Sequence, residues 1–203
     1  MAKARKIRKK PWGGRFREGP TKFVEMFTES VSFDQRLALY DIQGSIAHAK
    51  MLARCKIIKR EEGRKIIRGL EGVRGDVVSG KFRFEPGLED VHMNIEARLT
   101  RDIGPVGGKL HTGRSRNDQI ALDIRLYLKD VLINAQMQVL GLKSALLNLA
   151  HRYIDVVMPG YTHMRRAQPV LFAHYVLAYV EKLNRDGERM SDCLKRTDVL
   201  PLG

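Results

Sequence analysis

The residues best suited to chemistry lie close together at positions 109–119, with the sequence Lys-Leu-His-Thr-Gly-Arg-Ser-Arg-Asn-Asp-Gln. Arginine can hold a carboxylate through two parallel hydrogen bonds, which orients the bound group as well as balancing its charge. A second polar cluster, Pro-Gly-Tyr-Thr-His at 159–163, follows after a long stretch with helical spacing. Donors and cations at the two ends of one helix suit a substrate that carries several carboxylates.

The same residues also have an ordinary structural interpretation. Ser115 and Asn117 can cap the start of the helix. Arg114 and Arg116 can simply be solvated, and a lone histidine after a Pro-Gly turn, such as His163, is more often structural. The start of a helix nevertheless favours anions, because its free N–H groups and its dipole point toward them. The spacing alone leaves both interpretations of the 114–117 block open.

No sequence motif indicates a cofactor. The glycines at 107 and 108 precede Lys109, but Leu110 stands where a phosphate-binding loop has Ser or Thr. The histidines at 48, 92, 151 and 174 show no metal-ligand spacing, and the two cysteines form no CxxC pair. We therefore expect no metal, no organic cofactor and a reducing, cytoplasmic location.

Five stretches with apolar residues at helical spacing must position these clusters. They cover approximately 34–52, 61–78, 88–100, 118–150 and 169–198. Asp34 is expected to cap the first helix, Pro159-Gly160 to form a turn, and Pro169 to begin the last helix, where its missing N–H would be unpaired in any case. Since no alternating strand pattern extends beyond 81–84, we predict an all-α fold.

The chain is expected to have three parts. These are a disordered basic arm at 1–10, a mainly helical amino-terminal domain at 11–112 and a partial central helical bundle at 113–203. The two long helices each carry an apolar stripe that the other cannot fully cover, which indicates further helices from other segments or subunits. No apolar run approaches the roughly 20 residues of a membrane span.

The net charge of +14 is the strongest compositional feature. Six of the first ten residues are Lys or Arg, and without them the chain still carries +8. Clustered cations can neutralise nucleic-acid phosphates. However, zinc-finger spacing, RNP-type aromatic strands and a basic region joined to a heptad zipper are all missing from the sequence. We therefore favour a solvated basic tail over a nucleic-acid-binding protein, on a basic body that attracts anionic metabolites.

Several ordered sequence blocks resemble one enzyme family. The blocks are 12–16 (Trp-Gly-Gly-Arg-Phe), 27–30 (Phe-Thr-Glu-Ser), 41–45, 89–92, 108–119, 160–163, 167–169 and 199–203. From Trp12 to Gly203 the chain resembles the amino-terminal part of the argininosuccinate lyase family, in the fumarase/aspartase superfamily. The resemblance implies a helical amino-terminal domain followed by the first two long helices of a shared bundle.

The resemblance also implies a reaction and its residues. Family members cleave argininosuccinate reversibly to arginine and fumarate, in arginine biosynthesis and the urea cycle, by an anti elimination. By this resemblance His163 assists proton transfer. The substrate-binding residues are Ser30, Ser115, Arg116, Asn117 and Thr162, supported by Asp90 and Arg114. Family sites combine segments from three subunits of a homotetramer, so the blocks around Asn117 and His163 are expected to meet only across subunits.

Two departures from the family pattern matter. Arg165 occupies a position where the family usually has glutamine. The family's flexible Ser-Ser-x-Met-Pro-Gln-Lys loop, which supplies the catalytic serine, has no counterpart in residues 1–203. We therefore expect an amino-terminal fragment that is inactive alone. A non-catalytic protein of the delta-crystallin kind, a remnant of the family and a sister lyase that also yields fumarate stay as alternatives.

Overall fold

The computed structural model describes residues 20–201, which form two compact units. The first unit contains the described residues up to Ile124 and the second those from Arg125 onward, so one long helix contributes to both. The basic arm at 1–10 and the segment 12–16 lie outside the described residues. The domain limits at 11–112 and 113–203 stay a prediction.

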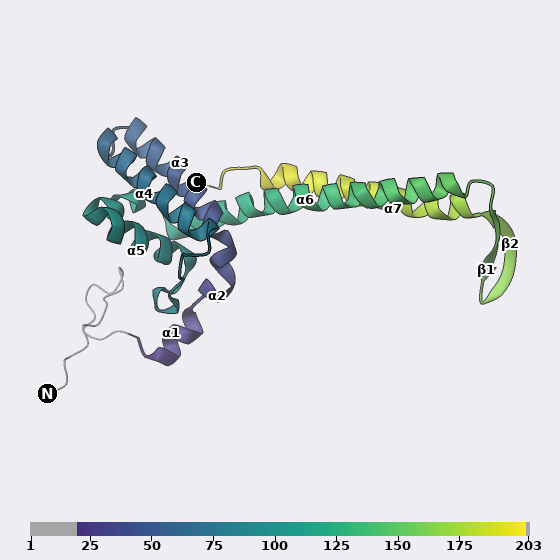
Figure 1. The fold of residues 1–203 in the computed structure, drawn as a ribbon, viewed down its shortest axis with the longest axis horizontal. Coiled ribbons are helices and arrows are strands. Elements are labelled where there is room, and N and C mark those ends of the chain that lie inside the picture. Colours follow the sequence, from purple (N-terminus) through teal and green to yellow (C-terminus); the bar gives the residue numbers. More distant parts are fainter. Residues whose placement is uncertain (1–19, 202–203) are drawn as a thin grey trace. The chain divides into compact units, whose positions relative to one another are not determined.

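The first unit is helical throughout (Figure 1). Its helices are α1 (Lys22–Thr28), α2 (Val31–Asp34), α3 (Ala38–Arg54), α4 (Arg60–Val78), α5 (Val91–Ile103) and the first turns of α6 (Arg116–Arg152). Short 3₁₀ helices lie at Gln35–Leu37 (η1), Pro86–Leu88 (η2) and Gly104–His111 (η3). The helices expected near 61–78, 88–100 and 118–150 are confirmed, as is the all-α class.

The core of the first unit lies between α3, α4 and α5. Ile42 of α3, Ile66 and Leu70 of α4 and Leu99 of α5 are completely buried. Gly69 allows α4 to approach α5 closely, because a Cβ atom at this position would lie 2.6 Å from Leu99 Cδ1. Gly69 lowers the helical propensity of α4 but improves the packing of α4 against α5. This packing helps to explain why α4 forms although it contains several glycines.

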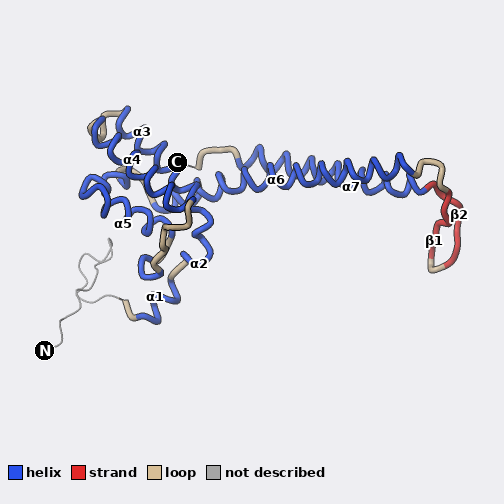
Figure 2. The backbone as a smooth tube through the Cα atoms, viewed as in Figure 1, coloured by secondary structure: helices blue, strands red, loops and turns tan. Residues whose placement is uncertain are grey.

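The second unit is an antiparallel helix pair that ends in a hairpin (Figures 1 and 2). The remainder of α6 is followed by β1 (Val157–Thr162), β2 (Arg165–Leu171) and α7 (Phe172–Thr197). Next to the hairpin, Ala150, Ala173 and Val176 form a small buried cluster with the partly buried Leu146 and Phe172. The hairpin therefore joins the ends of two helices that already pack against each other.

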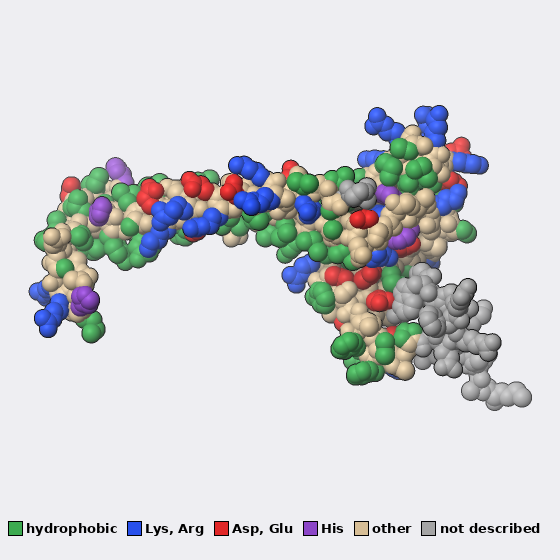
Figure 3. Space-filling view, turned by 180° about the vertical axis from the view of Figure 1, so that it is seen from behind, with side chains coloured by type: hydrophobic (Ala, Val, Ile, Leu, Met, Phe, Trp, Pro, Cys, Tyr) green, Lys and Arg blue, Asp and Glu red, His purple; other side chains and the backbone are tan. Residues whose placement is uncertain are grey.

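Both helices of the second unit leave apolar side chains exposed, and Figure 3 shows such side chains along the pair. On α6, Met137 is 63% exposed and Leu140 is 53% exposed, while Leu177 on α7 is 41% exposed. Extended exposed apolar surface is typical of contact with another protein surface. No helix within residues 20–201 combines the length and the apolar character needed to cross a membrane.

The hairpin corrects three sequence predictions. Pro159-Gly160 is not a turn but part of β1, and Pro169 pairs with Pro159 in β2 instead of beginning the last helix. The chain reverses at His163 and Met164, whose φ angles are 50° and 61°. We predicted no strands here, because nearly all side chains of both strands are exposed and no buried face imposes an alternating pattern.

Candidate functional site at the start of α6

The predicted substrate-binding block lies where α6 begins. Gly113, with a φ of 65°, turns the chain, and Ser115 then caps the helix by accepting a hydrogen bond from the Asn117 N–H, with 3.2 Å between Oγ and N. The capping interpretation of Ser115 is therefore correct. It does not exclude anion binding, because Ser115 and Asn117 are exposed at the end of the helix that favours negative charge.

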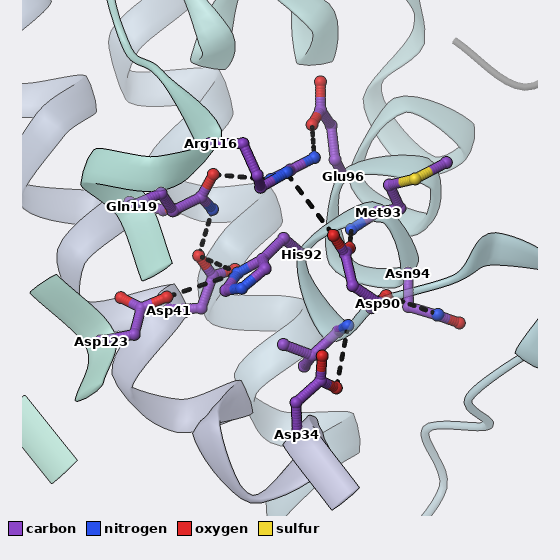
Figure 4. A network of polar contacts seen from close by, with 12 residues as sticks. Asp34, Asp41, Asp90, His92, Met93, Asn94, Glu96, Arg116, Gln119 and Asp123 are labelled. Carbon is purple, nitrogen blue, oxygen red and sulfur yellow. Dashed lines mark hydrogen bonds and ion pairs between the residues drawn. The ribbon is translucent and has the colours of Figure 1, made fainter. Parts of the chain in front are cut away.

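Arg116 is held by side chains from its own helix and from α5 (Figure 4). Its Nη1 donates to Gln119 Oε1 at 2.6 Å, and its Nη2 lies 3.4 Å from Glu96 Oε2. A third group, Asp90 Oδ2, lies 3.7 Å from Nε. The guanidinium is thus half-buried and oriented before any substrate is present.

Asp90 both caps α5 and contacts Arg116. Its Oδ1 accepts a hydrogen bond from the Met93 N–H at 2.6 Å, which caps α5. Its other oxygen faces Arg116. One carboxylate therefore fixes the start of α5 and contacts an arginine at the start of α6.

Ser30 lies in the same region through a chain of contacts. Its Oγ donates to Asp34 Oδ2 at 2.6 Å, and Asp34 Oδ1 accepts from the Val91 N–H at 3.1 Å. The Asp34 carboxylate therefore contacts the start of α5, and it forms no cap bond at the start of α3, which corrects the sequence prediction. The Ser30 hydroxyl thus binds the same carboxylate that links α2 to the start of α5.

Arg114 carries a half-buried positive charge. Its Nη1 donates to Ser45 Oγ on α3 at 3.0 Å. Burial lowers the pKa of the Arg114 guanidinium, and the nearby carboxylates of Asp41 and Asp123 offset part of this effect. Arg114 therefore serves as the counter-charge for acidic groups inside the unit. The supporting role that the family resemblance implies for it stays a prediction.

Those acidic groups belong to a polar cluster that the sequence analysis did not identify. His92 Nδ1 lies 3.2 Å from Asp41 Oδ1 and 3.3 Å from Asp123 Oδ2, and all three side chains are at most 2% exposed. Gln119, also buried, donates from Nε2 to Asp41 Oδ1 (Figure 4). The cluster joins α3, α5 and α6.

The two carboxyl groups of this cluster differ in their affinity for protons. Burial and the adjacent negative charge of Asp41 raise the pKa of Asp123 to about 9. Burial also acts to raise the pKa of Asp41, but contacts with His92, Gln119 and Arg114 outweigh it and lower that pKa below its usual value. At neutral pH the cluster therefore contains an ionised Asp41 and a protonated Asp123.

Among the described residues, Asp41, His92 and Asp123 have ligand atoms within 4.8 Å of one another, the kind of spacing at which a cation can be held. The charge of Arg114 beside both carboxyl groups works against a bound cation, as does the donation from Gln119 to Asp41. The expected absence of a metal stays a prediction.

The remaining predicted residues, Thr162 and His163, belong to the second unit. Both are exposed at the tip of the hairpin, and Thr162 pairs with Arg165 across the two strands. Arg165, which departs from the family pattern, is exposed as well. The structure thus collects Ser30, Asp90 and the 114–117 block in one unit, while the hairpin residues lie in the other.

Sequence reasoning missed Asp41, Glu96, Gln119 and Asp123 as parts of this site. A signal was present in their spacing, because Asp41 and Ser45, like Gln119 and Asp123, lie four positions apart and so share a helix face. Their burial could not be read from that spacing, since polar residues at helical spacing are usually solvated.

A family model described as lyase matches residues 14–203. The argininosuccinate lyase of Geotalea daltonii is 57% identical over 194 residues, a match that covers 96% of this chain and 42% of the relative. The argininosuccinate lyase of Syntrophus aciditrophicus is 55% identical, with 96% and 41% covered. The chain thus spans about two fifths of the length of these curated relatives.

Solved structures share the fold. An EDDS lyase variant with bound fumarate has a TM-score of 0.75 and 32% identity, and the match covers 89% of this chain and 35% of that one. A fumarate lyase:delta crystallin from Brucella melitensis has a TM-score of 0.69 at 17% identity, over 88% of this chain and 46% of the other. The second likeness concerns the fold alone.

Proposed function

Because the chain belongs to the lyase family, within the fumarase/aspartase superfamily, we propose that it forms part of an enzyme that cleaves argininosuccinate reversibly to arginine and fumarate. The observation that carries this proposal is the 57% identity to an argininosuccinate lyase across 96% of the chain. The geometry at the start of α6 supports it. A succinyl group carries two carboxylates, and this region offers exposed neutral donors beside an oriented arginine.

In the proposed site, Arg116, Ser115 and Asn117 bind a carboxylate of the succinyl group. Arg116 can contribute because a guanidinium has more N–H donors than the contacts to Gln119, Glu96 and Asp90 use. Charge-assisted bonds of this kind stabilise the negative charge that develops on a carboxylate when the neighbouring carbon loses its proton. Ser30 and Thr162 are proposed as further substrate contacts.

His163 is proposed to assist proton transfer, since imidazole can both accept and donate a proton near neutral pH. In the proposed anti elimination, a base removes a proton from the succinyl carbon, the electron pair forms the double bond of fumarate, and the C–N bond breaks. The nitrogen keeps the bonding pair and takes up a proton as arginine leaves. By the family resemblance, the base itself is a serine from another segment.

We also propose that the site is shared between subunits of a homotetramer. Thr162 and His163 are exposed on a hairpin in one unit, and the arginine block lies in the other unit. The exposed apolar side chains of α6 and α7 supply a surface on which further helices can pack.

The test is to express the complete protein that contains this chain and to follow fumarate release from argininosuccinate, with an Arg116→Ala variant as control. We expect the wild-type protein to release fumarate and the Arg116→Ala variant to lose this activity. The 32% identity to an EDDS lyase makes a sister lyase the second candidate, so other N-substituted succinates belong in the same assay. Cleavage of one of these alone would favour the sister lyase, and no cleavage of any would favour a non-catalytic protein.

A further inference from the structure

Gln119 connects the buried cluster to the proposed substrate site. It lies in the first turn of α6 and is 3% exposed. Its Oε1 accepts from Arg116 Nη1 at 2.6 Å, and its Nε2 donates to Asp41 Oδ1. Figure 4 shows its amide between the guanidinium and the carboxylate.

The chemistry of the two partners allows one orientation of this amide. A guanidinium only donates hydrogen bonds, and an ionised carboxylate only accepts them. The amide oxygen must therefore face Arg116 and the amide nitrogen must face Asp41. The side chain is fixed at both ends, in contrast to an exposed glutamine, which can rotate freely.

The groups around Asp41 keep it an acceptor. His92 on α5 lies against it, the half-buried Arg114 supplies a positive charge, and the pKa of the adjacent Asp123 on α6 is raised to about 9. Glu96 and Arg116 face this cluster as well, Asp90 lies against Arg116, and Asp34 interacts electrostatically with His92.

The contact with Gln119 is the shortest of the three that hold Arg116. The two carboxylates lie at 3.4 Å and 3.7 Å, distances that leave the guanidinium free to shift. A bond of 2.6 Å to a fixed acceptor limits such a shift.

We propose that Gln119 is a positioning residue of the lyase site, which Asp41 fixes at one end and which aims the Arg116 guanidinium at the substrate carboxylate. This inference rests on the proposed function. It assigns no contact between Gln119 and substrate. The residue acts through Arg116, and the buried cluster of Asp41, His92 and Asp123 acts through Gln119.

The first experiment compares Gln119→Met with wild type in the complete protein. Methionine keeps the length and packing of the side chain but removes both hydrogen bonds. A less firmly held Arg116 should form weaker charge-assisted bonds to the substrate carboxylate. KM for argininosuccinate is therefore expected to rise about 10-fold or more, with a smaller change in kcat. Gln136→Met is the matched control, since Gln136 lies on the same helix and donates to Ser191 Oγ in the second unit.

A polarity swap provides the rescue. Gln119→Glu places two carboxylates against each other and is expected to raise KM, whereas Asp41→Asn/Gln119→Glu restores a donor facing an acceptor and conserves the total charge. The double variant should recover most of the wild-type KM. If Gln119 has a purely structural role, every variant should instead lower thermal stability. The double variant should then restore neither the wild-type KM nor the wild-type kcat.

The guanidinium can be observed directly in the full chain by NMR of isotope-labelled arginine side chains. The Arg116 Nε–H signal should be sharp and protected in wild type, broadened in Gln119→Met and restored in the double variant. An unchanged signal, or a KM that matches that of Gln136→Met, overturns the inference. Wild-type protein without lyase activity would instead refute the proposed function, and the NMR comparison would still decide whether Gln119 holds Arg116.

Discussion

The two regions that carry the proposed site residues are built in opposite ways. At the start of α6, Arg116 is half-buried and contacts three side chains, and a buried polar cluster lies behind it. At the hairpin tip, Thr162 and His163 are exposed, and the neighbouring Met164 is 99% exposed. One region is organised within the chain. The other would need a covering surface to exclude water if its residues take part in the proposed reaction.

Under the proposal of a shared site, the contrast suggests a different contribution from each region. Preorganised donors are effective because they need not reorient during the reaction. An exposed hairpin can reach into the site of a neighbouring subunit, and the exposed apolar faces of α6 and α7 are suited to bring that neighbour close.

The largest expected effect concerns sharing of the site. In the complete protein, His163→Asn should lower activity by about 10²–10⁴-fold, the usual cost of losing a proton-transfer group. Asn117→Ala should also lower activity, because it removes a proposed substrate contact. Mixing the two denatured variants and refolding them should restore part of the activity, because some sites then contain only wild-type residues. Each variant refolded alone is the control. Mixed tetramers that stay inactive would show that both residues act within one subunit.

The next largest effect is a difference in stability loss between variants of the two buried carboxyl groups, Asp41 and Asp123. Asp41→Asn should lower the free energy of unfolding by about 1–3 kcal/mol, because Gln119 loses a charged acceptor and His92 loses the carboxylate that lies 3.2 Å from its Nδ1. Asp123→Asn should change it far less, because an amide resembles a protonated carboxyl group and can donate to Asp41. Denaturant unfolding at neutral pH measures both. Equal losses for the two variants would contradict the assignment of the proton to Asp123.

The same assignment predicts a pH dependence. The pKa of Asp123 is raised from an unfolded value of about 4 to about 9 in the folded chain, so the folded state binds this proton more tightly. The stability that it contributes is complete below the unfolded pKa and is lost progressively as pH rises toward 9. Unfolding measured across this range should show a decline that Asp123→Asn removes. A slope that is identical in the variant would exclude Asp123 as its source.

The smallest effect is expected at the hairpin tip. Met164 has a φ of 61°, which costs a residue with a side chain more than it costs glycine. Met164→Gly should therefore stabilise the hairpin locally by roughly 0.5–1 kcal/mol. Hydrogen exchange of the β1 and β2 amides is the measurement, and Met158→Gly within β1 is a control that should accelerate exchange. Faster exchange in Met164→Gly would mean that this conformation carries no such strain.

Much of the helical architecture could be predicted from sequence, and the hairpin could not. Apolar residues at helical spacing predicted α4, α5 and α6. In α4 and α5 most of these residues are buried, whereas many of those on α6 are exposed. The side chains of the strands at 157–162 and 165–171 are almost all exposed. Their sequences therefore lack the alternation of apolar and polar residues that predicts a strand. Pro169 was placed at the start of a helix because proline is suited to that position, yet the helix begins at Phe172 and the proline lies in an exposed strand.

The sequence by itself determined the family and the location of the arginine-rich block, because local motifs and helical periodicity are properties of neighbouring residues. Only the tertiary structure decided which polar residues stand behind that block. Asp41, His92 and Asp123 come from three helices, and nothing in their local sequences indicates that they meet. Their proximity follows from the packing of α3, α5 and α6. Burial acts to raise the pKa of both Asp41 and Asp123, but contacts with His92, Gln119 and Arg114 lower that of Asp41 alone. Neighbouring residues in sequence specify a helix, but the environment of a side chain depends on the distant segments that pack against it.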